Sequence, residues 1–391
     1  MKVNIKTLAF SGVIFLLSAC TESEPSADRI KSISENDMTL KLALAWPLGD
    51  SSNEGTKASI KQGVDLAVSK INKEGGVLGR RLEVAMYDDQ RSINVGLNVS
   101  ADIIDEADVF AVIGHLDSYI SVPAAANYDR AGIINLNPGA ADPRLTGFGA
   151  TGVFSLIPNS ESQGRRLAKY LDNRGISSVA VYYIDNAYGK VLANGLEVHA
   201  DALGLNIADK RSYQKRSKDH DRIFQYWSDF LSFEAVILIA SMPEGKEIVS
   251  SIRDAGINAP IFAAPGVDTI TFARDVDPTE EQDLYVMSYF HPDYPSEGTR
   301  DFVNSFEAYT GMPPSEASAA LGYDSVNILV RAVEHTGSLE RADVAAALKE
   351  VIDWRGAAGR YSFNSDGEPL DKLLLINVVR NQGYEFHQVI E

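Results

Sequence analysis

Short apolar runs and amphipathic stretches alternate along the chain from about residue 39. At residues 40–46 large apolar side chains alternate with Lys or Ala, and Pro47 follows, which predicts a strand and its exit loop. A helix follows, because apolar residues recur at helical spacing up to Ile71, with Asn53 as the expected N-cap and Gly75-Gly76 as the expected end. The same reasoning predicts strands at 82–87, 109–113 and 133–134 and helices at 95–104 and 122–128.

A second series of strands and helices begins after Gly152. It comprises helices at 163–171, 192–203, 223–230 and 248–255 and strands at 179–184, 235–240 and 261–263. Helices at 299–309, 318–334 and 344–351 come next, and strands at 373–379 and 384–390 close the chain. Repeated alternation of strand and helix implies α/β parallel sheets covered by helices on both faces, and two series imply two lobes.

The N-terminus carries a pattern of its own. Lys2 and Lys6 precede an apolar run at 8–17, and the text then reads Leu17-Ser18-Ala19-Cys20. The run is about half the length that spans a bilayer, so residues 1–19 are expected to be a secretory signal peptide and not a transmembrane helix.

Leu17-Ser18-Ala19-Cys20 also resembles a bacterial lipobox, and Cys20 is the sole cysteine in the sequence. That resemblance implies cleavage before Cys20 and a diacylglycerol on its thiol, with palmitate among the acyl chains. The alternative is an ordinary secretory signal in which Cys20 is incidental. Residues 20–38 are rich in Ser, Glu and Asp and are expected to form a flexible tether. Thr21 stands where an aspartate would resemble an inner-membrane retention signal, so outer-membrane sorting is allowed.

Composition narrows the classes of partner. Loss of residues 1–19 would take the net charge from −18 to −20, because two lysines leave and no acid does. An acidic body disfavours nucleic acid and anionic lipid surfaces as partners, and solubility alone also explains the charge. Without a second cysteine the folded body has no disulfide, so burial of a hydrophobic core must hold it together. About 350 residues are enough for such a core and are expected to form two domains.

Candidate ligand-binding residues lie in the loops after the predicted strands, because ligands of open α/β sheets bind there. Trp46 at a strand end suits the wall of a cleft as a large, partly exposed ring. Ser118 follows another strand and is expected to cap the next helix, which is an alternative to ligand binding. Tyr188 is a candidate for ligand binding, and ordinary packing is the alternative. His115 is expected to be a turn or packing residue and not a metal ligand, since no second His or Cys lies at the spacing of metal ligands. Metal sites and cofactors are therefore not expected.

Enzyme signatures are missing from the sequence. It contains no Gly-x-Ser-x-Gly elbow, no phosphate-cradling loop ending in Gly-Lys-Ser/Thr and no His-Glu-x-x-His. The glycines between Gly147 and Gly152 match a dinucleotide motif only loosely and do not lie between a strand and a long helix. The chain is thus expected not to be an enzyme.

Several motifs in this order resemble the periplasmic leucine/isoleucine/valine-binding proteins and their wider class, the type I solute-binding proteins of ABC importers. The resemblance covers the chain from about residue 40 to the C-terminus. The matching text is Ile71-Asn72-Lys73-Glu74-Gly75-Gly76, Leu78-Gly79, Tyr87-Asp88-Asp89, Val112-Ile113-Gly114-His115-Leu116-x-Ser118, Gly132-Ile133, Asn137-Pro138-Gly139-Ala140, Ser162-Gln163-Gly164, Tyr188-Gly189 and Phe363-Asn364-Ser365-Asp366-Gly367.

The resemblance implies two doubly wound lobes joined by a three-segment hinge that closes on a ligand. Lobe 1 would be residues 39–157 plus 290–363, and lobe 2 residues 158–289 plus 364–391. It also implies an ABC permease as partner and a place on the periplasmic side of a bacterial envelope.

In amino-acid-binding members of that class, a serine after the Gly-His-Leu motif and groups after the Pro-Gly turn hold the ligand carboxylate. Ser118 and the backbone at Gly139 match this pattern, whereas the expected threonine is Ala141. The glutamate that usually holds the α-ammonium is missing from the Pro265 loop, and Asp268 is its nearest substitute. The usual tyrosine of lobe 2 is replaced by Ser241 or Met242, and the two cysteines that form a disulfide in some members are absent. A buried ammonium without a carboxylate partner costs several kcal/mol, so a carboxylate or neutral polar ligand fits as well as an amino acid.

Three functions follow from this reading. The first is a lipid-anchored receptor that delivers a small polar molecule, such as an amino acid or a related carboxylate or amide, to an importer. Trp46, Ser118, Gly139, Ala141, Tyr188 and Asp268 would line its cleft. The second is a sensor or assembly subunit of an envelope system with the same fold. The third, a hydrolase, is disfavoured by the missing nucleophile and base.

Overall fold

The structure, a computed structural model, describes residues 38–49, 54–217 and 219–390. The predicted signal peptide, the lipidation site at Cys20, the tether up to residue 37 and the expected N-cap Asn53 lie outside these ranges. Among the described residues, none of the helices has the length and apolar character that crossing a membrane requires.

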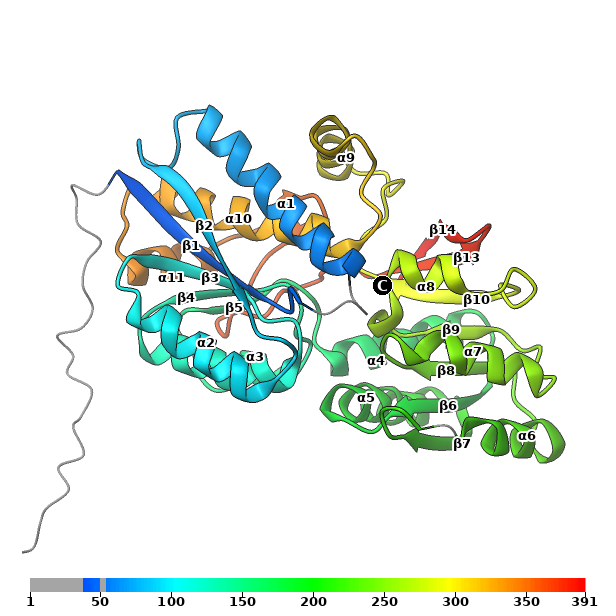
Figure 1. The fold of residues 1–391 in the computed structure, drawn as a ribbon. Helices are drawn as coiled ribbons and strands as arrows, with labels where there is room; N and C mark the ends of the chain where they lie inside the picture. Colours follow the sequence, from blue (N-terminus) through cyan, green and yellow to red (C-terminus); the bar gives the residue numbers. More distant parts are fainter. Residues whose placement is uncertain (1–37, 50–53, 218, 391) are drawn as a thin grey trace, which may run out of the picture. The chain divides into compact units, whose positions relative to one another are not determined.

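The first sheet is built from five parallel strands in the order β2-β1-β3-β4-β5 (Figure 1). Their bounds are β1 Thr39–Trp46, β2 Arg81–Asp88, β3 Val109–Gly114, β4 Ile134–Asn137 and β5 Val153–Ser155. Strands β3, β4 and β5 are buried along their whole length, as expected of a parallel sheet covered on both faces.

Helices from two separate stretches of the chain lie around this sheet: those of the first stretch contact its strands, and those of the second pack mainly against other helices. They are α1 Glu54–Lys73, α2 Ile93–Asp105, α3 Ser118–Arg130, α9 Glu297–Thr310, α10 Ala317–Thr336 and α11 Arg341–Lys349, with the short η3 at Pro143–Leu145. Helices α1 and α10 are in close contact (Figure 1). Gly63 makes this approach possible, because a Cβ there would lie 1.9 Å from the carbonyl oxygen of Ala319.

The second sheet has seven strands in the order β14-β13-β10-β9-β8-β6-β7. Their bounds are β6 Ser178–Ile184, β7 Asn206–Tyr213, β8 Ala235–Ile239, β9 Ile261–Ala263, β10 Leu284–Ser288, β13 Leu375–Arg380 and β14 Gly383–Val389. Its helices are α4 Ser160–Asn173, α5 Ala187–Leu203, α6 His220–Phe230, α7 Glu244–Asp254 and α8 Ile270–Asp275, with η4 at Pro265–Val267. A separate hairpin joins β11 Trp354–Gly356 to β12 Gly359–Tyr361.

One edge of the second sheet departs from the expected parallel arrangement. Strand β13 pairs antiparallel with both β10 and β14, whereas the other pairs in this sheet are parallel. The turn between β13 and β14 holds Asn381 and Gln382 at φ 53° and 59°, the geometry of a two-residue hairpin turn. The predicted α/β class with doubly wound, parallel-dominated lobes is nevertheless confirmed.

Several elements escaped the periodicity analysis. Strands β5, β7 and β10 were not predicted, because β5 is short and β7 carries polar residues along its exposed edge. The three predicted changes of lobe, near residues 157, 289 and 363, fall between elements. The assignment of residues to lobes stays a prediction.

Candidate functional site

A cavity of about 390 Å³ is bordered by loops from both sheets. Its lining residues follow β1, β3 and β4 of the first sheet and β6, β8, β9 and β10 of the second, and the start of α10 completes the wall. These loops leave the carboxyl ends of strands, where open α/β sheets bind ligands. All six predicted ligand residues lie on this one wall: Trp46, Ser118, Gly139, Ala141, Tyr188 and Asp268.

Ser118 is the first residue of α3 and not its N-cap, so the expected capping role is wrong. The N-cap is Asp117, whose side chain makes no capping hydrogen bond. The reason is that the Asp117 carboxylate is engaged elsewhere, by Arg91. Ser118 lines the cavity at the N-terminus of α3, where the positive end of the helix dipole favours an anion.

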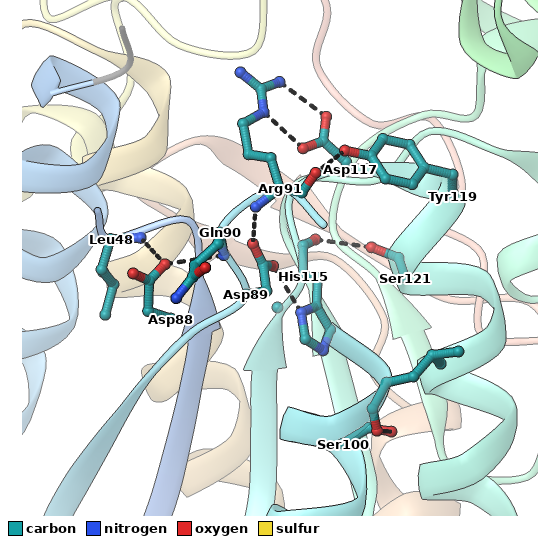
Figure 2. Close-up of polar contacts among 12 residues, drawn as sticks. Leu48, Asp88, Asp89, Gln90, Arg91, Ser100, His115, Asp117, Tyr119 and Ser121 are labelled. Atoms are coloured by element: carbon teal, nitrogen blue, oxygen red, sulfur yellow. Dashed lines mark hydrogen bonds and ion pairs between the residues drawn. The ribbon is translucent and has the colours of Figure 1, made fainter. Parts of the chain in front are cut away.

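Arg91 and Asp117 form a bidentate ion pair on the cavity wall (Figure 2). Arg91 Nε donates to Asp117 Oδ2 over 2.8 Å and Nη2 donates to Oδ1 over 2.9 Å. The hydroxyl of Tyr119 also donates to the Arg91 carbonyl over 2.7 Å. The loop after β2 is thereby tied to the loop after β3, next to Ser118.

His115 is a buried structural residue, as the sequence indicated, and it does not line the cavity. Its Nδ1 donates to Asp89 Oδ2 over 2.8 Å, and its Nε2 accepts from the Tyr128 hydroxyl over 3.1 Å. The His115 carbonyl accepts from Ser121 Oγ over 3.0 Å (Figure 2). These bonds fix the loop that leads into Ser118. Among the described residues, no three His, Cys, Asp or Glu side chains are placed to hold a metal ion.

The Asn137-Pro138-Gly139 turn forms the next part of the wall. Asn137 Oδ1 accepts from the backbone N–H groups of Gly139 over 3.1 Å and of Ala140 over 2.7 Å, which sets the turn. A Cβ at Gly139 would lie 2.9 Å from Trp46 Cη2 and 2.8 Å from Leu116 Cα, so only glycine fits. Ala141 lies beyond the turn and is buried.

Trp46 is buried, with 1% of its surface exposed, although it lines the cavity. The prediction of a partly exposed ring is therefore wrong. The ring packs in the main hydrophobic core, and the Cη2 end of the ring contacts the Gly139 turn. Trp46 thus supplies a fixed apolar wall.

Tyr188 comes from the second sheet's side, on the first turn of α5. The Asn186 side chain caps this helix by accepting from the N–H of Gly189 over 2.9 Å. The Tyr188 hydroxyl accepts from the N–H of Gly266 over 3.1 Å, linking the loops after β6 and β9. Burial raises the pKa of Tyr188, and the bond from Gly266 only partly offsets this, so the phenol is neutral at pH 7.

Asp268 follows η4 and lines the cavity beside Tyr289. Burial raises its pKa to about 7, a hydrogen bond from Ser288 opposes the rise, and the charge of Glu316 adds to it. Ser288 Oγ lies 2.6 Å from Asp268 Oδ2 and 2.8 Å from the Phe290 carbonyl. One hydroxyl proton serves one acceptor, so both contacts are satisfied when Asp268 carries a proton and donates to Ser288.

Sequence reasoning missed other residues of the wall. Arg91 lies just after the quoted Tyr87-Asp88-Asp89 motif, and its position past a strand end could have marked it. Tyr289 follows β10, which was not predicted as a strand. Ala317 and Leu321 lie in the first turns of α10, and no local pattern places a helix start at a cavity between two sheets.

The sequence matches the family model described as "Periplasmic binding protein" over residues 39–383. The chain belongs to the periplasmic binding protein family. Members with named ligands are among its relatives. The "Leu/Ile/Val-binding protein homolog 1" of Brucella suis is 26% identical over 314 residues, which cover 80% of this chain and 83% of that protein.

Solved structures of this family agree with the fold. An ABC transporter substrate-binding protein from Desulfitobacterium hafniense, in complex with Leu, is 32% identical, with a TM-score of 0.79 over 89% of this chain and 100% of that chain. The branched-chain amino acid transporter substrate binding protein LivJ from Streptococcus pneumoniae, in complex with isoleucine, is 23% identical. Its TM-score is 0.82 over 90% of this chain and 99% of that chain, a likeness of fold.

Proposed function

We propose that this periplasmic binding protein captures a small polar solute with a carboxylate group, an amino acid or a close relative, and delivers it to an ABC importer. One observation carries the proposal: the cavity of about 390 Å³ brings loops of both sheets together around Ser118 at the start of α3. A volume in this range suits a small ligand.

Different parts of the cavity wall would contact different parts of the solute. The Ser118 hydroxyl and the N-terminus of α3 would hold the carboxylate, because both favour negative charge. Trp46 and the Gly139 turn would cover the apolar part of the solute, and Tyr188 would contribute from the other sheet. A solute contacting both sheets would favour a closed arrangement of the lobes over an open one.

The relatives support an amino acid as solute. The Desulfitobacterium hafniense protein, at 32% identity, is solved in complex with Leu. The Brucella suis relative is named a homolog of a Leu/Ile/Val-binding protein. Neither fixes the solute of this chain, whose wall carries Ala141 and Asp268.

The proposal extends to the place of the protein in the cell. Its family supports an extracytoplasmic location. We place the chain on the membrane through a lipid on Cys20, from the leader pattern Leu17-Ser18-Ala19-Cys20. Labelling of the wild-type chain, but not of Cys20→Ser, by an alkyne-bearing palmitate would support this anchor. Equal labelling of both would refute it.

The central experiment identifies the solute. Native mass spectrometry of the purified chain would reveal a copurifying small molecule, and calorimetry with leucine, valine and that molecule would measure each affinity. Binding of a carboxylate-bearing solute that also raises the melting temperature is expected, because a ligand of the folded state stabilises it. Turnover of any compound in the panel would instead point to an enzyme.

A further inference from the structure

Gln163, in the Ser162-Gln163-Gly164 motif at the start of α4, is a polar residue to which the proposed function gives no role. Its side chain is completely buried. Gln163 Nε2 donates to the Pro158 carbonyl over 2.7 Å and lies 2.9 Å from the Tyr289 hydroxyl. Because a proline carbonyl can only accept, the orientation of the amide is fixed, and the second Nε2 proton goes to Tyr289.

The other end of this amide is unsatisfied. Gln163 Oε1 is buried without a hydrogen-bond partner among the described residues. A buried acceptor without a donor destabilises a fold, whereas an apolar side chain of the same size has no such cost. The two bonds from Nε2 are therefore what distinguishes Gln163 from an apolar residue at this place.

Tyr289 connects Gln163 to the main cavity. It directly follows β10, lies on the cavity wall and is 9% exposed. Gln163 itself is not among the lining residues. A solute in the cavity can thus contact Tyr289, and the hydroxyl of the same side chain is held from behind by Gln163.

Three segments, here called the crossing segments, carry the chain between the two groups of elements. Residues 156–159 join β5 of the first sheet to α4 and β6, and residues 289–296 join β10 of the second sheet to α9. Residues 362–374 join β12 to β13 of the second sheet. This last segment begins beside the first sheet, because the Gly367 carbonyl accepts from the N–H of Ser155 on β5 over 2.9 Å.

Each crossing segment is hydrogen-bonded to the first two turns of α4. The first segment provides Pro158, which accepts from Gln163, and the second provides Tyr289. In the third, the Lys372 carbonyl accepts from Arg166 Nη1 over 2.6 Å. The start of α4 is therefore a place where all three segments are joined.

The N-cap of α4 adds a further bond between two of these segments. Asn159 Oδ1 accepts from the N–H of Ser162 over 2.8 Å and caps the helix, while Nδ2 donates to the Glu368 carboxylate in the third segment. A shift of this helix start would therefore be felt at both segments.

We propose that Gln163 is a positioning residue for solute binding, which joins the wall of the main cavity to the crossing segments through the Tyr289 hydroxyl. This inference rests on the proposed function of that cavity. A solute that restrains Tyr289 also restrains Gln163 and, through it, Pro158 at the start of α4. Binding is thereby coupled to the segments about which the two sheets can move.

A double-mutant cycle on leucine affinity tests this link. Calorimetry would compare the wild type with Gln163→Met, Tyr289→Phe and the double variant. Each single variant is expected to bind leucine roughly three- to tenfold more weakly, the worth of one hydrogen bond between neutral groups. The double variant should be no weaker than the weaker single variant, because both changes remove the same bond. Losses that multiply in the double variant would show that Gln163 does not act through Tyr289, and would overturn the proposal.

Gln225→Met is the matched control for this cycle. Gln225 is an exposed glutamine on α6, and its Nε2 donates to Asp229 in the same helix. This variant should bind leucine as the wild type does.

Hydrogen exchange followed by mass spectrometry gives a readout that a packing role alone would not change. Saturating leucine is expected to slow exchange in the loop around Ser118 and in the crossing segments of the wild type. In Tyr289→Phe at saturating leucine, the loop should stay protected, while protection of residues 362–374 falls by roughly half or more. Wild-type protection of those residues in the variant would overturn the proposal.

The outcomes separate this inference from the proposed function. Tyr289→Phe decides the question if Gln163→Met fails to fold, because it leaves the bond from Gln163 to Pro158 in place. If leucine binds every variant as tightly as the wild type, the inference is wrong while the proposed function stands. Where valine or a copurified molecule binds and leucine does not, that solute replaces leucine in both measurements. If all of them fail to bind the wild type, both proposals are wrong.

Discussion

Arg91 donates hydrogen bonds to both carboxylate oxygens of Asp117, with Nε–Oδ2 and Nη2–Oδ1 distances of 2.8 and 2.9 Å. The pair lies on the cavity wall next to Ser118 (Figure 2). Without Arg91, a negative charge would stand at the start of α3, where the proposed carboxylate site requires a positive field. On the proposed function, the ion pair would favour binding of the solute carboxylate by neutralising Asp117.

Arg91→Met is expected to weaken binding of the solute carboxylate by roughly 1–2 kcal/mol, the repulsion of two like charges several ångströms apart at a partly exposed site. Asp117→Asn in the same chain should restore most of the affinity, because it removes the unpaired charge. Calorimetry with leucine or the copurified solute would measure both. A double variant as weak as Arg91→Met would show that Arg91 acts by packing and not by charge.

Ser118→Ala tests the carboxylate site itself. The loss of one hydrogen bond to a charged group predicts affinity weaker by about 1–3 kcal/mol, with little change in melting temperature. Ser162→Ala on α4, outside the cavity wall, is the matched control and should bind as the wild type does. Unchanged affinity in Ser118→Ala would remove this residue from the site.

Gly139→Ala tests the fit of the turn against the tryptophan. The new Cβ would meet Trp46 Cη2 at 2.9 Å and Leu116 Cα at 2.8 Å, so the wall must shift. Affinity should fall at least tenfold, and the unfolding free energy by about 1–3 kcal/mol, as overpacking does. In the control Gly152→Ala the nearest atom lies 3.7 Å away, so both quantities should stay near wild type. Equal behaviour of the two variants would contradict a tight fit at Gly139.

Asp268 gives stability a defined pH dependence. Burial raises its pKa to about 7, whereas an unfolded aspartate titrates near pH 3.9. Between these values the unfolded chain has lost a proton that the folded chain keeps, so this residue lowers the unfolding free energy as pH rises from about 4 to about 7. The Asp268→Asn variant should lack this decline. Its unfolding free energy should therefore rise relative to that of the wild type by roughly 1–3 kcal/mol as the pH increases from 4 to 8. Urea unfolding at both pH values would measure it, and parallel wild-type and variant profiles would contradict the shift.

Asp324 and Lys372 form a buried polar cluster with Tyr361. Asp324 accepts from the N–H groups of Ala357 and Ala358 and from the Tyr361 hydroxyl over 2.7 to 2.9 Å. The Lys372 ammonium lies 3.4 Å from the centre of the Tyr361 ring. Burial raises the pKa of Asp324 and lowers that of Lys372, and the attraction between the two opposes both shifts.

Removal of one charge from this cluster leaves the other buried without a counter-charge. Asp324→Asn and Lys372→Met are each expected to lower the unfolding free energy by about 3 kcal/mol. Lys190→Met, at an exposed ion pair with Asp185, should change it by less than about 1 kcal/mol. Urea unfolding would compare all three, and equal effects would show that the buried cluster does not stabilise the fold.

The amino-acid pattern determined a large part of this architecture. Buried apolar runs marked most strands, and helical spacing with Gly75-Gly76 marked the end of α1, which the structure places at Lys73. Because parallel strands of a sheet end at the same edge, the loops holding Ser118, Gly139 and Tyr188 could be assigned to one cavity without a structure. These properties are local or follow from the topology of alternating strands and helices.

The tertiary structure alone decided which distant residues meet. Asp268, Glu316 at the start of α10 and Asn377 on β13 come together around one small cavity of about 100 Å³. Asp117 occupies the N-cap position of α3, but its side chain makes no capping hydrogen bond, because its carboxylate is paired with Arg91 from another loop. The ring of Trp46 is buried, although its place at a strand end suggested exposure. Periodicity records which face of an element is apolar, whereas the partners of a side chain depend on how elements far apart in sequence pack, and no short pattern contains that information.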